Sequence, residues 1–242
     1  MPQDTKTIAE HLVDLKNLFL KLFASWLVIA IILSFFTQTL IDLFTRPLGD
    51  IALTLNFFSP TDSMFFVLKI ITVSALIVSS PLIFWFLWQY LGKAIAEKEK
   101  NFLFNYLGSA LILTLIAITY SYLYLIPSSL KFLTDFTPKN TGIILSATEY
   151  SNFLISMFLV ITIVFQTPIL VMSLVKTGLV KIETFKAKRK EIYFGIILLT
   201  ALFGSPDVFS WIISTLPVFV LFEGSLFFAS KSFKNVKVED NG

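Results

Sequence analysis

Three acidic residues have the charge and the setting to bind a cation. Asp14 lies near the start of the chain, and Glu97 and Glu99 lie in a short segment otherwise rich in lysine. Carboxylates accept bidentate hydrogen bonds from guanidinium groups, so these acids could form a site for an arginine-bearing ligand. The residues alone favour a simpler alternative, in which all three are solvated surface charges offset by the neighbouring lysines.

Three more polar residues lie inside apolar stretches. Hydrocarbon cannot satisfy the amide of Gln166, so it must bond to another helix of this chain or to a helix of a partner protein. Lys69 lies near the end of its stretch, where its ammonium group can reach the membrane interface. Glu223 lies close to Lys231 and can reach the interface in the same way, or it can have a specific role.

Composition excludes several kinds of chemistry. The 242 residues contain no cysteine, which excludes disulfides, thiolate chemistry and Cys-ligated zinc, and one histidine, His11, which makes a conventional metal site improbable. Neither a nucleophile–base pair nor a glycine-rich phosphate loop is visible. We therefore expect no enzymatic activity and no cofactor. The net charge of +3 is dispersed beside apolar stretches, which favours anionic lipid over nucleic acid as the contact.

The elements that carry these residues are predicted to be membrane helices. Hydrophobic residues make up 56% of the chain and charged residues 14%, against about 25% in soluble domains. Residues 7–17 predict a short amphipathic helix on the cytoplasmic surface, opened by a capping box. The apolar pattern predicts a single transmembrane domain over residues 1–242, with six spans at about 18–38, 63–91, 102–126, 150–175, 192–204 and 208–230.

The positive charges orient these spans. All but four of the 19 Lys and Arg residues lie in the N-terminal arm, the second and fourth loops and the C-terminal tail. Because a bilayer retains Lys and Arg on its cytoplasmic side, both termini are predicted to be cytoplasmic. The expected fold is an all-α, multi-pass protein of the cell inner (cytoplasmic) membrane.

Prolines and loops complete the expected topology. The loop at 39–62 is expected outside, and Pro127 is expected to end the third span. The last two helices are expected to be short, because 192–204 is brief for a hydrocarbon core of about 30 Å and Pro217 interrupts 208–230. Basic clusters flank this pair, so it must cross the membrane twice as a hairpin.

Several segments match motifs of one family in the right order and at the right spacing. The chain resembles the TatC family, the polytopic subunit of the twin-arginine protein translocase, over nearly its whole length. The matching segments are Glu10-His-Leu-Val-Asp14-Leu-Lys16, Phe65-Phe-Val-Leu-Lys69, Trp88-Gln-Tyr90 with Glu97-Lys-Glu99-Lys100, Tyr122-Leu-Tyr-Leu-Ile-Pro127, and Ser205-Pro-Asp207-Val-Phe-Ser210 with Leu221-Phe-Glu223.

The resemblance implies roles for individual residues. The loop glutamate that helps bind the signal peptide's arginine pair falls on Glu99, with Glu97 beside it, and the supporting N-terminal acid falls on Asp14. The adjacent aromatic residue falls on Tyr90, where the family more often has Phe. Structural or interface positions fall on Lys69, Asp207 and Glu223, and the family's frequent glutamate in the fourth span is replaced by Gln166.

The resemblance also implies a function. The chain would be a receptor for twin-arginine signal peptides and the core subunit of a translocase. Such a translocase exports folded proteins using the proton-motive force. The implied partners are small single-span subunits of the TatA/TatB type, membrane lipid and further copies of the chain. Two other classes compete with this interpretation: a small-solute secondary transporter, which would show repeated halves and ionisable groups at the bilayer midplane, and a scaffold without transport function.

Overall fold

The computed structural model describes residues 8–49, 55–94, 97–135, 144–176, 179–203 and 208–232. These residues form two compact units, within Met1–Phe44 with Ser63–Leu111 and within Thr45–Asp62 with Ile112–Gly242. The elements are α1 (Ile8–Ser34), α2 (Thr37–Gly49), β1 (Leu55–Asn56), α3 (Pro60–Ala94), α4 (Glu97–Tyr120), η1, a π-helical turn (Ser121–Leu125), α5 (Ile126–Asp135), β2 (Leu145–Ser146), α6 (Ala147–Phe165), α7 (Thr167–Lys176), α8 (Ile182–Ala187), α9 (Arg189–Phe203) and α10 (Val208–Ser232).

Five helical segments of the described residues are long and apolar enough to cross a membrane. They are Leu12–Ser34, Pro60–Gly92, Leu103–Asp135, Ala147–Lys176 and Val208–Lys231. The fifth predicted span, at 192–204, corresponds to α9, which has 15 residues and rises about 22 Å, less than a hydrocarbon core of about 30 Å. The prediction that the last helix is also short is wrong, because α10 is continuous over 25 residues.

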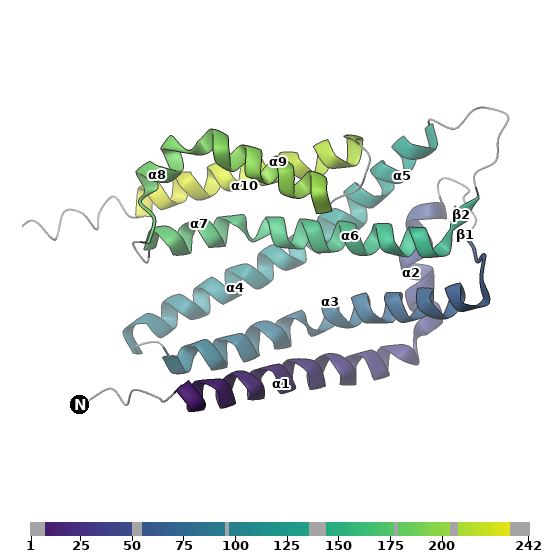
Figure 1. Ribbon diagram of the computed structural model, residues 1–242, viewed down its shortest axis with the longest axis horizontal. Helices are drawn as coiled ribbons and strands as arrows, with labels where there is room; N and C mark the ends of the chain where they lie inside the picture. The colour runs from purple at the N-terminus through teal and green to yellow at the C-terminus, as the bar shows by residue number, and fades with distance from the viewer. Residues whose placement is uncertain are drawn as a thin grey trace, which may run out of the picture. The chain divides into compact units, whose positions relative to one another are not determined.

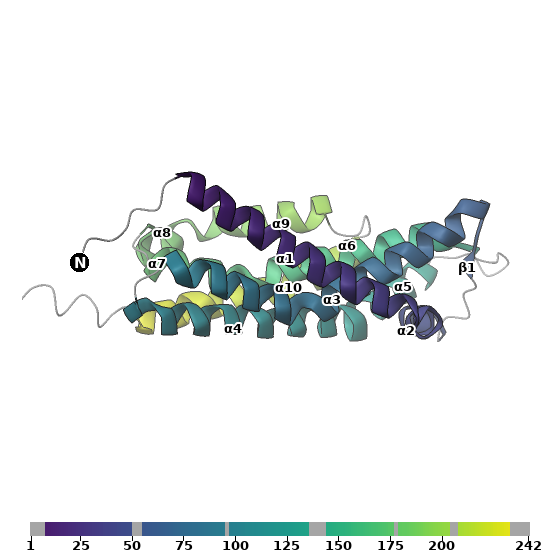
Figure 2. The ribbon, with the colours of Figure 1, turned by 90° about the horizontal axis from the view of Figure 1, so that it is seen from below.

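In the first unit, α1 and α3 run antiparallel and side by side (Figure 1), and they cross at an angle (Figure 2). The indole nitrogen of Trp26 in α1 donates to the carbonyl of Thr72 in α3, 3.4 Å away. The amphipathic helix predicted at 7–17 and the first span form one unbroken helix, which ends at Ser34 rather than at residue 38. The start of α1 therefore lies at the same end of this unit as the end of α3.

The segment 39–62, predicted as a loop, contains most of helix α2. Its apolar residues recur at helical spacing, and Phe44 and Leu48, four residues apart, are both buried. Pro47 and Gly49 favoured a loop, but burial of this apolar stripe stabilises a helix over these residues.

One buried apolar cluster of the second unit lies where α6, α7, α8, α9 and α10 meet. Figure 1 shows α7 and α10 side by side, with α9 folded back on α10. The strands β1 and β2 pair in parallel, with Leu55 opposite Leu145. The buried apolar cluster comprises Val160, Val164, Val171, Phe185, Ile196, Val218, Phe222 and Leu226.

At Pro81 and Pro168, the hydroxyl of the preceding residue donates to the carbonyl that the proline leaves without its usual amide partner. A proline lacks the N–H that would bond to the carbonyl four residues earlier. For Pro81 in α3 that carbonyl belongs to Ile77, and the hydroxyl of Ser80 donates to it at 2.7 Å. The helix continues through Pro81 because the freed carbonyl is satisfied within the membrane.

At Pro168 the helix breaks instead, between α6 and α7. The hydroxyl of Thr167 donates to the freed carbonyl of Val164 at 2.6 Å. Gln166 caps α6, and its backbone N–H reaches the carbonyls of Ile163 and Val164. The predicted fourth span at 150–175 is therefore two helices that meet at Gln166.

The third span does not stop at Pro127, where it was predicted to end. The π-helical turn η1 precedes this proline, and the N–H of Ile126 bonds five residues back to the carbonyl of Ser121. Pro127 is then the second residue of α5, and a proline is tolerated in the first turn of a helix. The helical path consequently runs on to Asp135.

Pro217 does not interrupt α10, because a residue far away in sequence satisfies the carbonyl that it frees. The hydroxyl of Tyr120, at the end of α4, donates to the carbonyl of Ile213 at 3.1 Å. That carbonyl lies four residues before Pro217, so the tyrosine takes the place of the missing backbone donor.

We expect Tyr120→Phe to lower the free energy of unfolding by about 1 kcal/mol, the usual net value of a buried hydrogen bond. The same change in a Pro217→Ala background should have little effect, because an alanine there supplies its own backbone N–H to the carbonyl of Ile213. Thermal unfolding of the four proteins in detergent gives the coupling energy. An equal loss of stability in both backgrounds would contradict this role for Tyr120.

Candidate functional site

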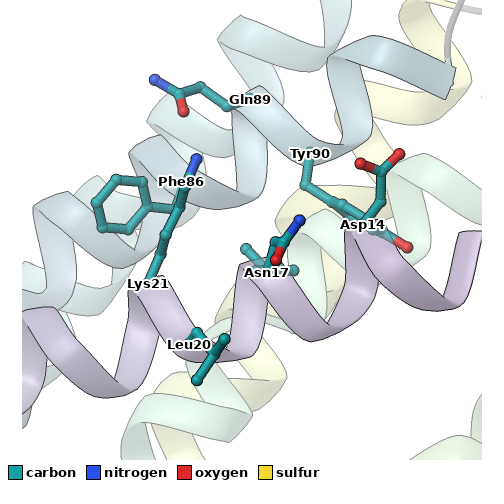
Figure 3. Close-up of a pocket in the computed structure, with 8 residues that line it drawn as sticks. Asp14, Asn17, Leu20, Lys21, Phe86, Gln89 and Tyr90 are labelled. Carbon is teal, nitrogen blue, oxygen red and sulfur yellow. The ribbon is translucent and has the colours of Figure 1, made fainter. Parts of the chain in front are cut away.

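A pocket of about 280 Å³ lies between α1 and α3 in the first unit. Figure 3 shows the Asp14 carboxylate beside Tyr90, with Asn17 next along α1 and Lys21 extending past Phe86. The complete lining is Asp14, Asn17, Leu18, Leu20, Lys21, Phe86, Gln89 and Tyr90.

Helical spacing explains why these residues meet. Asp14, Leu18 and Lys21 are separated by four and three residues, so they share one face of α1. Phe86 and Tyr90 share one face of α3 in the same way. Because the two helices are antiparallel, the beginning of one face meets the end of the other.

The pocket carries charges of both signs. Asp14 contributes a half-buried carboxylate, and Lys21 contributes an exposed ammonium group that lies 6.0 Å from the centre of the Phe86 ring. Such a cation–π contact fixes the position of the lysine while leaving its N–H groups able to donate. The pocket can therefore receive a cationic group at one end and an anionic group at the other.

Two of the predicted binding residues are brought together, and two lie outside the described side chains. Asp14 and Tyr90 line the pocket. The backbones of Glu97 and Glu99 form the first turn of α4 in the same unit, and their side chains lie outside the part of the chain that the structure describes.

Gln166 has a hydrogen-bond partner within its own chain. Its side-chain amide nitrogen donates to the hydroxyl of Thr114 in α4, 3.0 Å away. The sequence left two possible partners for Gln166, a helix of the same chain or a helix of another protein. The structure shows a bond to a helix of the same chain. The Gln166 side chain is only partly buried, so part of its amide stays accessible to a second contact.

Glu223 belongs to a polar cluster that the sequence did not suggest. Arg189, at the start of α9, forms a salt bridge of 3.2 Å with Glu223, and the hydroxyl of Tyr193 donates to the same carboxylate. The Tyr193 ring packs against Phe219 and Phe222 at 4.8 and 5.7 Å. The spacing of Arg189 and Tyr193, four residues apart on one helix, is the pattern that would have revealed a shared partner.

Of the two remaining predicted residues, only Lys69 is described, and it does not line the pocket. Lys69 is half-buried in α3, and no residue of its part of that helix lines the pocket. Asp207 lies outside the described residues.

Comparison with known proteins gives consistent matches over the chain. Residues 10–217 match the family "Sec-independent protein translocase protein (TatC)". The chain is similar to the Sec-independent protein translocase protein TatCy of Bacillus subtilis, with 26% identity over 98% of this chain and 94% of that protein. It is also similar to TatC of Escherichia coli K12, with 25% identity over 94% of this chain and 89% of that protein.

A solved structure shares the fold. A crystal structure of the twin-arginine translocase receptor TatC in the detergent DDM superimposes with a TM-score of 0.78. The match has 23% identity and covers 90% of this chain and 99% of that one.

Proposed function

Because the chain belongs to the TatC family of Sec-independent protein translocase proteins, we propose that it is the signal-peptide receptor and core subunit of a twin-arginine translocase. Family membership makes it a multi-pass membrane component of twin-arginine protein translocation, and the resemblance drawn from its motifs is confirmed. The proposal assigns it the step at which a folded cargo protein is recognised.

One observation carries the receptor role. Asp14 and Tyr90, assigned to the arginine-pair site from sequence, line one pocket although 76 positions separate them along the chain. Tyr90 lies one turn before the end of α3, and α4 begins with Glu97 shortly afterwards in the same unit. Chain connectivity therefore supports a site in which Glu99 and Asp14 share a guanidinium pair, with Tyr90 against its apolar stem.

Peptide binding to the purified protein in lipid nanodiscs tests this role. A twin-arginine peptide should bind at least about tenfold more tightly than its Lys-Lys version, because an ammonium group cannot form the bidentate pair. Equal affinity for the two peptides would contradict the receptor function. Restored export of a folded twin-arginine reporter in a strain lacking the translocase would separate translocation from solute transport and scaffolding.

We also propose a location, partner subunits and an energy source for the protein. The protein would lie in the cytoplasmic membrane with both termini cytoplasmic and would assemble with TatA/TatB-type single-span subunits and further copies of itself. Transport would use the proton-motive force, as the resemblance to the family implies.

Single-cysteine labelling tests the orientation, and the chain has no native cysteine to interfere. Cysteine in Pro206→Cys, in the segment of sequence between α9 and α10, should react with an impermeant thiol reagent added from outside. Lys234→Cys in the C-terminal tail is the control and should react only from the cytoplasmic side. Labelling of position 206 from the cytoplasm alone would overturn the topology.

We propose that Gln166 also contacts a membrane helix of a partner subunit. Its side chain is only partly buried, and it lies at the break between α6 and α7, where backbone groups are less regularly bonded. The bond to Thr114 orients the amide, and an amide has hydrogen-bonding capacity for more than one partner.

Gln166→Leu should impair transport while the protein stays folded, because interhelical hydrogen bonds in membranes average only about 0.6 kcal/mol. Gln166→Glu should stay active, since it restores the residue that the family resemblance leads one to expect. Thr114→Val is the matched control: it removes the partner within the chain and should leave transport and cross-linking from position 166 largely intact. If Thr114→Val lowers transport as much as Gln166→Leu does, the glutamine acts only within its own chain.

A further inference from the structure

The pocket between α1 and α3 contains a feature that an arginine pair does not need. A site for cations alone requires acidic and aromatic groups, yet this pocket also presents the ammonium group of Lys21 and the amides of Asn17 and Gln89. These three groups offer N–H donors, which suit phosphate oxygens. The lining is therefore complementary to a ligand that carries a cation and an anion together.

The spacing of the two charged residues limits the size of that ligand. Asp14 and Lys21 are seven residues apart on one face of α1, which corresponds to about 10 Å along the helix. Both side chains can lean toward a ligand between them, so the pocket suits a ligand whose cation and anion are joined by a short linker. A two-carbon linker between an ammonium and a phosphate group fits this description.

An apolar path leads from the pocket along the membrane-spanning part of α1. Leu20, Phe23, Leu27 and Ile31 lie near one face of the helix and are 55%, 59%, 41% and 53% exposed. Within the 18-residue apolar window by which Leu12–Ser34 qualifies as a membrane span, only 6% of the window is buried inside the protein. Because Leu20 also lines the pocket, a headgroup bound there would have its acyl chains lying along this stripe.

We propose that the pocket binds the headgroup of a zwitterionic phospholipid with a primary ammonium group, of the phosphoethanolamine type. Its ammonium donates to the Asp14 carboxylate beside Tyr90, and its phosphate accepts from Lys21, Asn17 and Gln89. A primary ammonium is preferred to a quaternary one because Lys21 already lies over the Phe86 ring, the aromatic face that a quaternary group would use.

This lipid site shares Asp14 with the proposed peptide site. Lipid binding itself stands independently of the receptor function, whereas competition between lipid and peptide for Asp14 rests on it. The bound headgroup would occupy the carboxylate until an arginine-bearing peptide displaces it.

Lipid retention measured by native mass spectrometry tests the proposal without any peptide. The full-length protein is incubated with an equimolar mixture of phosphatidylethanolamine, phosphatidylcholine and phosphatidylglycerol with matched acyl chains. Wild type should retain phosphatidylethanolamine preferentially. Lys21→Gln and Asp14→Asn should each lower that retention about fivefold to tenfold, a range set by the solvent screening of the exposed lysine.

Lys16→Gln is the matched control, because it removes the same charge from the same end of α1 at a position outside the pocket. Its retention should equal that of wild type. Soluble phosphoethanolamine should compete only weakly, since it lacks the acyl chains. Equal retention of the three lipids, or equal losses in Lys16→Gln and Lys21→Gln, would overturn the proposal. Unchanged lipid retention with reduced peptide affinity in Lys21→Gln would assign the whole pocket to the peptide.

Discussion

Glu99→Gln is expected to lower the affinity for a twin-arginine peptide by about 10- to 150-fold. This range corresponds to the loss of one charge-assisted pair worth about 1.5–3 kcal/mol. Glutamine keeps the shape of the side chain and removes its charge, so the change tests the ion pair rather than the packing. Asp14→Asn should act in the same direction with a smaller effect, because the family resemblance gives Asp14, which lines the pocket from α1, a supporting role.

Two comparisons make this result specific. Glu183→Gln removes an acidic charge from α8 at an exposed position outside the pocket and should leave peptide affinity unchanged. Glu97 and Glu99 are two residues apart on α4, which places them about 200° apart around the helix. We therefore expect only one of the variants Glu97→Gln and Glu99→Gln to lose affinity for the peptide. Unchanged affinity in both Glu99→Gln and Asp14→Asn would refute the assignment.

Phe222→Ala is expected to lower the free energy of unfolding by about 3 kcal/mol, the largest stability effect that we expect of a single residue. Phe222 has no exposed surface, lies in the cluster where α7, α8, α9 and α10 meet, and packs edge-on against Tyr193. Removing its ring leaves a cavity whose walls lose their van der Waals contacts. In a membrane these contacts matter most, because lipid is as apolar as the helices are.

Phe228→Ala on the same helix is the matched control. Phe228 is 63% exposed, so its removal creates no cavity, and the unfolding temperature in detergent should stay close to that of wild type. Similar losses in the two variants would show that α10 is stabilised by its general hydrophobicity rather than by this cluster.

The membrane spans and the family follow from the sequence because each depends on a sum over neighbouring residues. The apolar content of a window decides whether it can cross a bilayer, and five of the predicted spans correspond to helical segments of sufficient length and hydrophobicity. Motifs such as Phe65-Phe-Val-Leu-Lys69 require only residue types at fixed spacing, so the family could be recognised without coordinates.

The errors occurred where a local rule depends on a distant partner. Pro217 was expected to interrupt its helix, and it does not because Tyr120, at the far end of another span, donates to the carbonyl of Ile213. Pro127 was expected to end a helix, and the wider turn η1 shifts the hydrogen bonds ahead of it. Both outcomes depend on how backbone groups near a proline are satisfied, which a proline rule alone does not contain.

By itself the sequence determined the class of this protein and its family, and it proposed residues with the chemistry to bind arginine. Only the tertiary structure decided which of those residues meet. Asp14 faces Tyr90, Gln166 bonds to Thr114, and Glu223 pairs with Arg189 and Tyr193. These partners lie on different helices, and the rotation of each helix about its axis is set by packing against its neighbours, a property that no single segment of sequence contains.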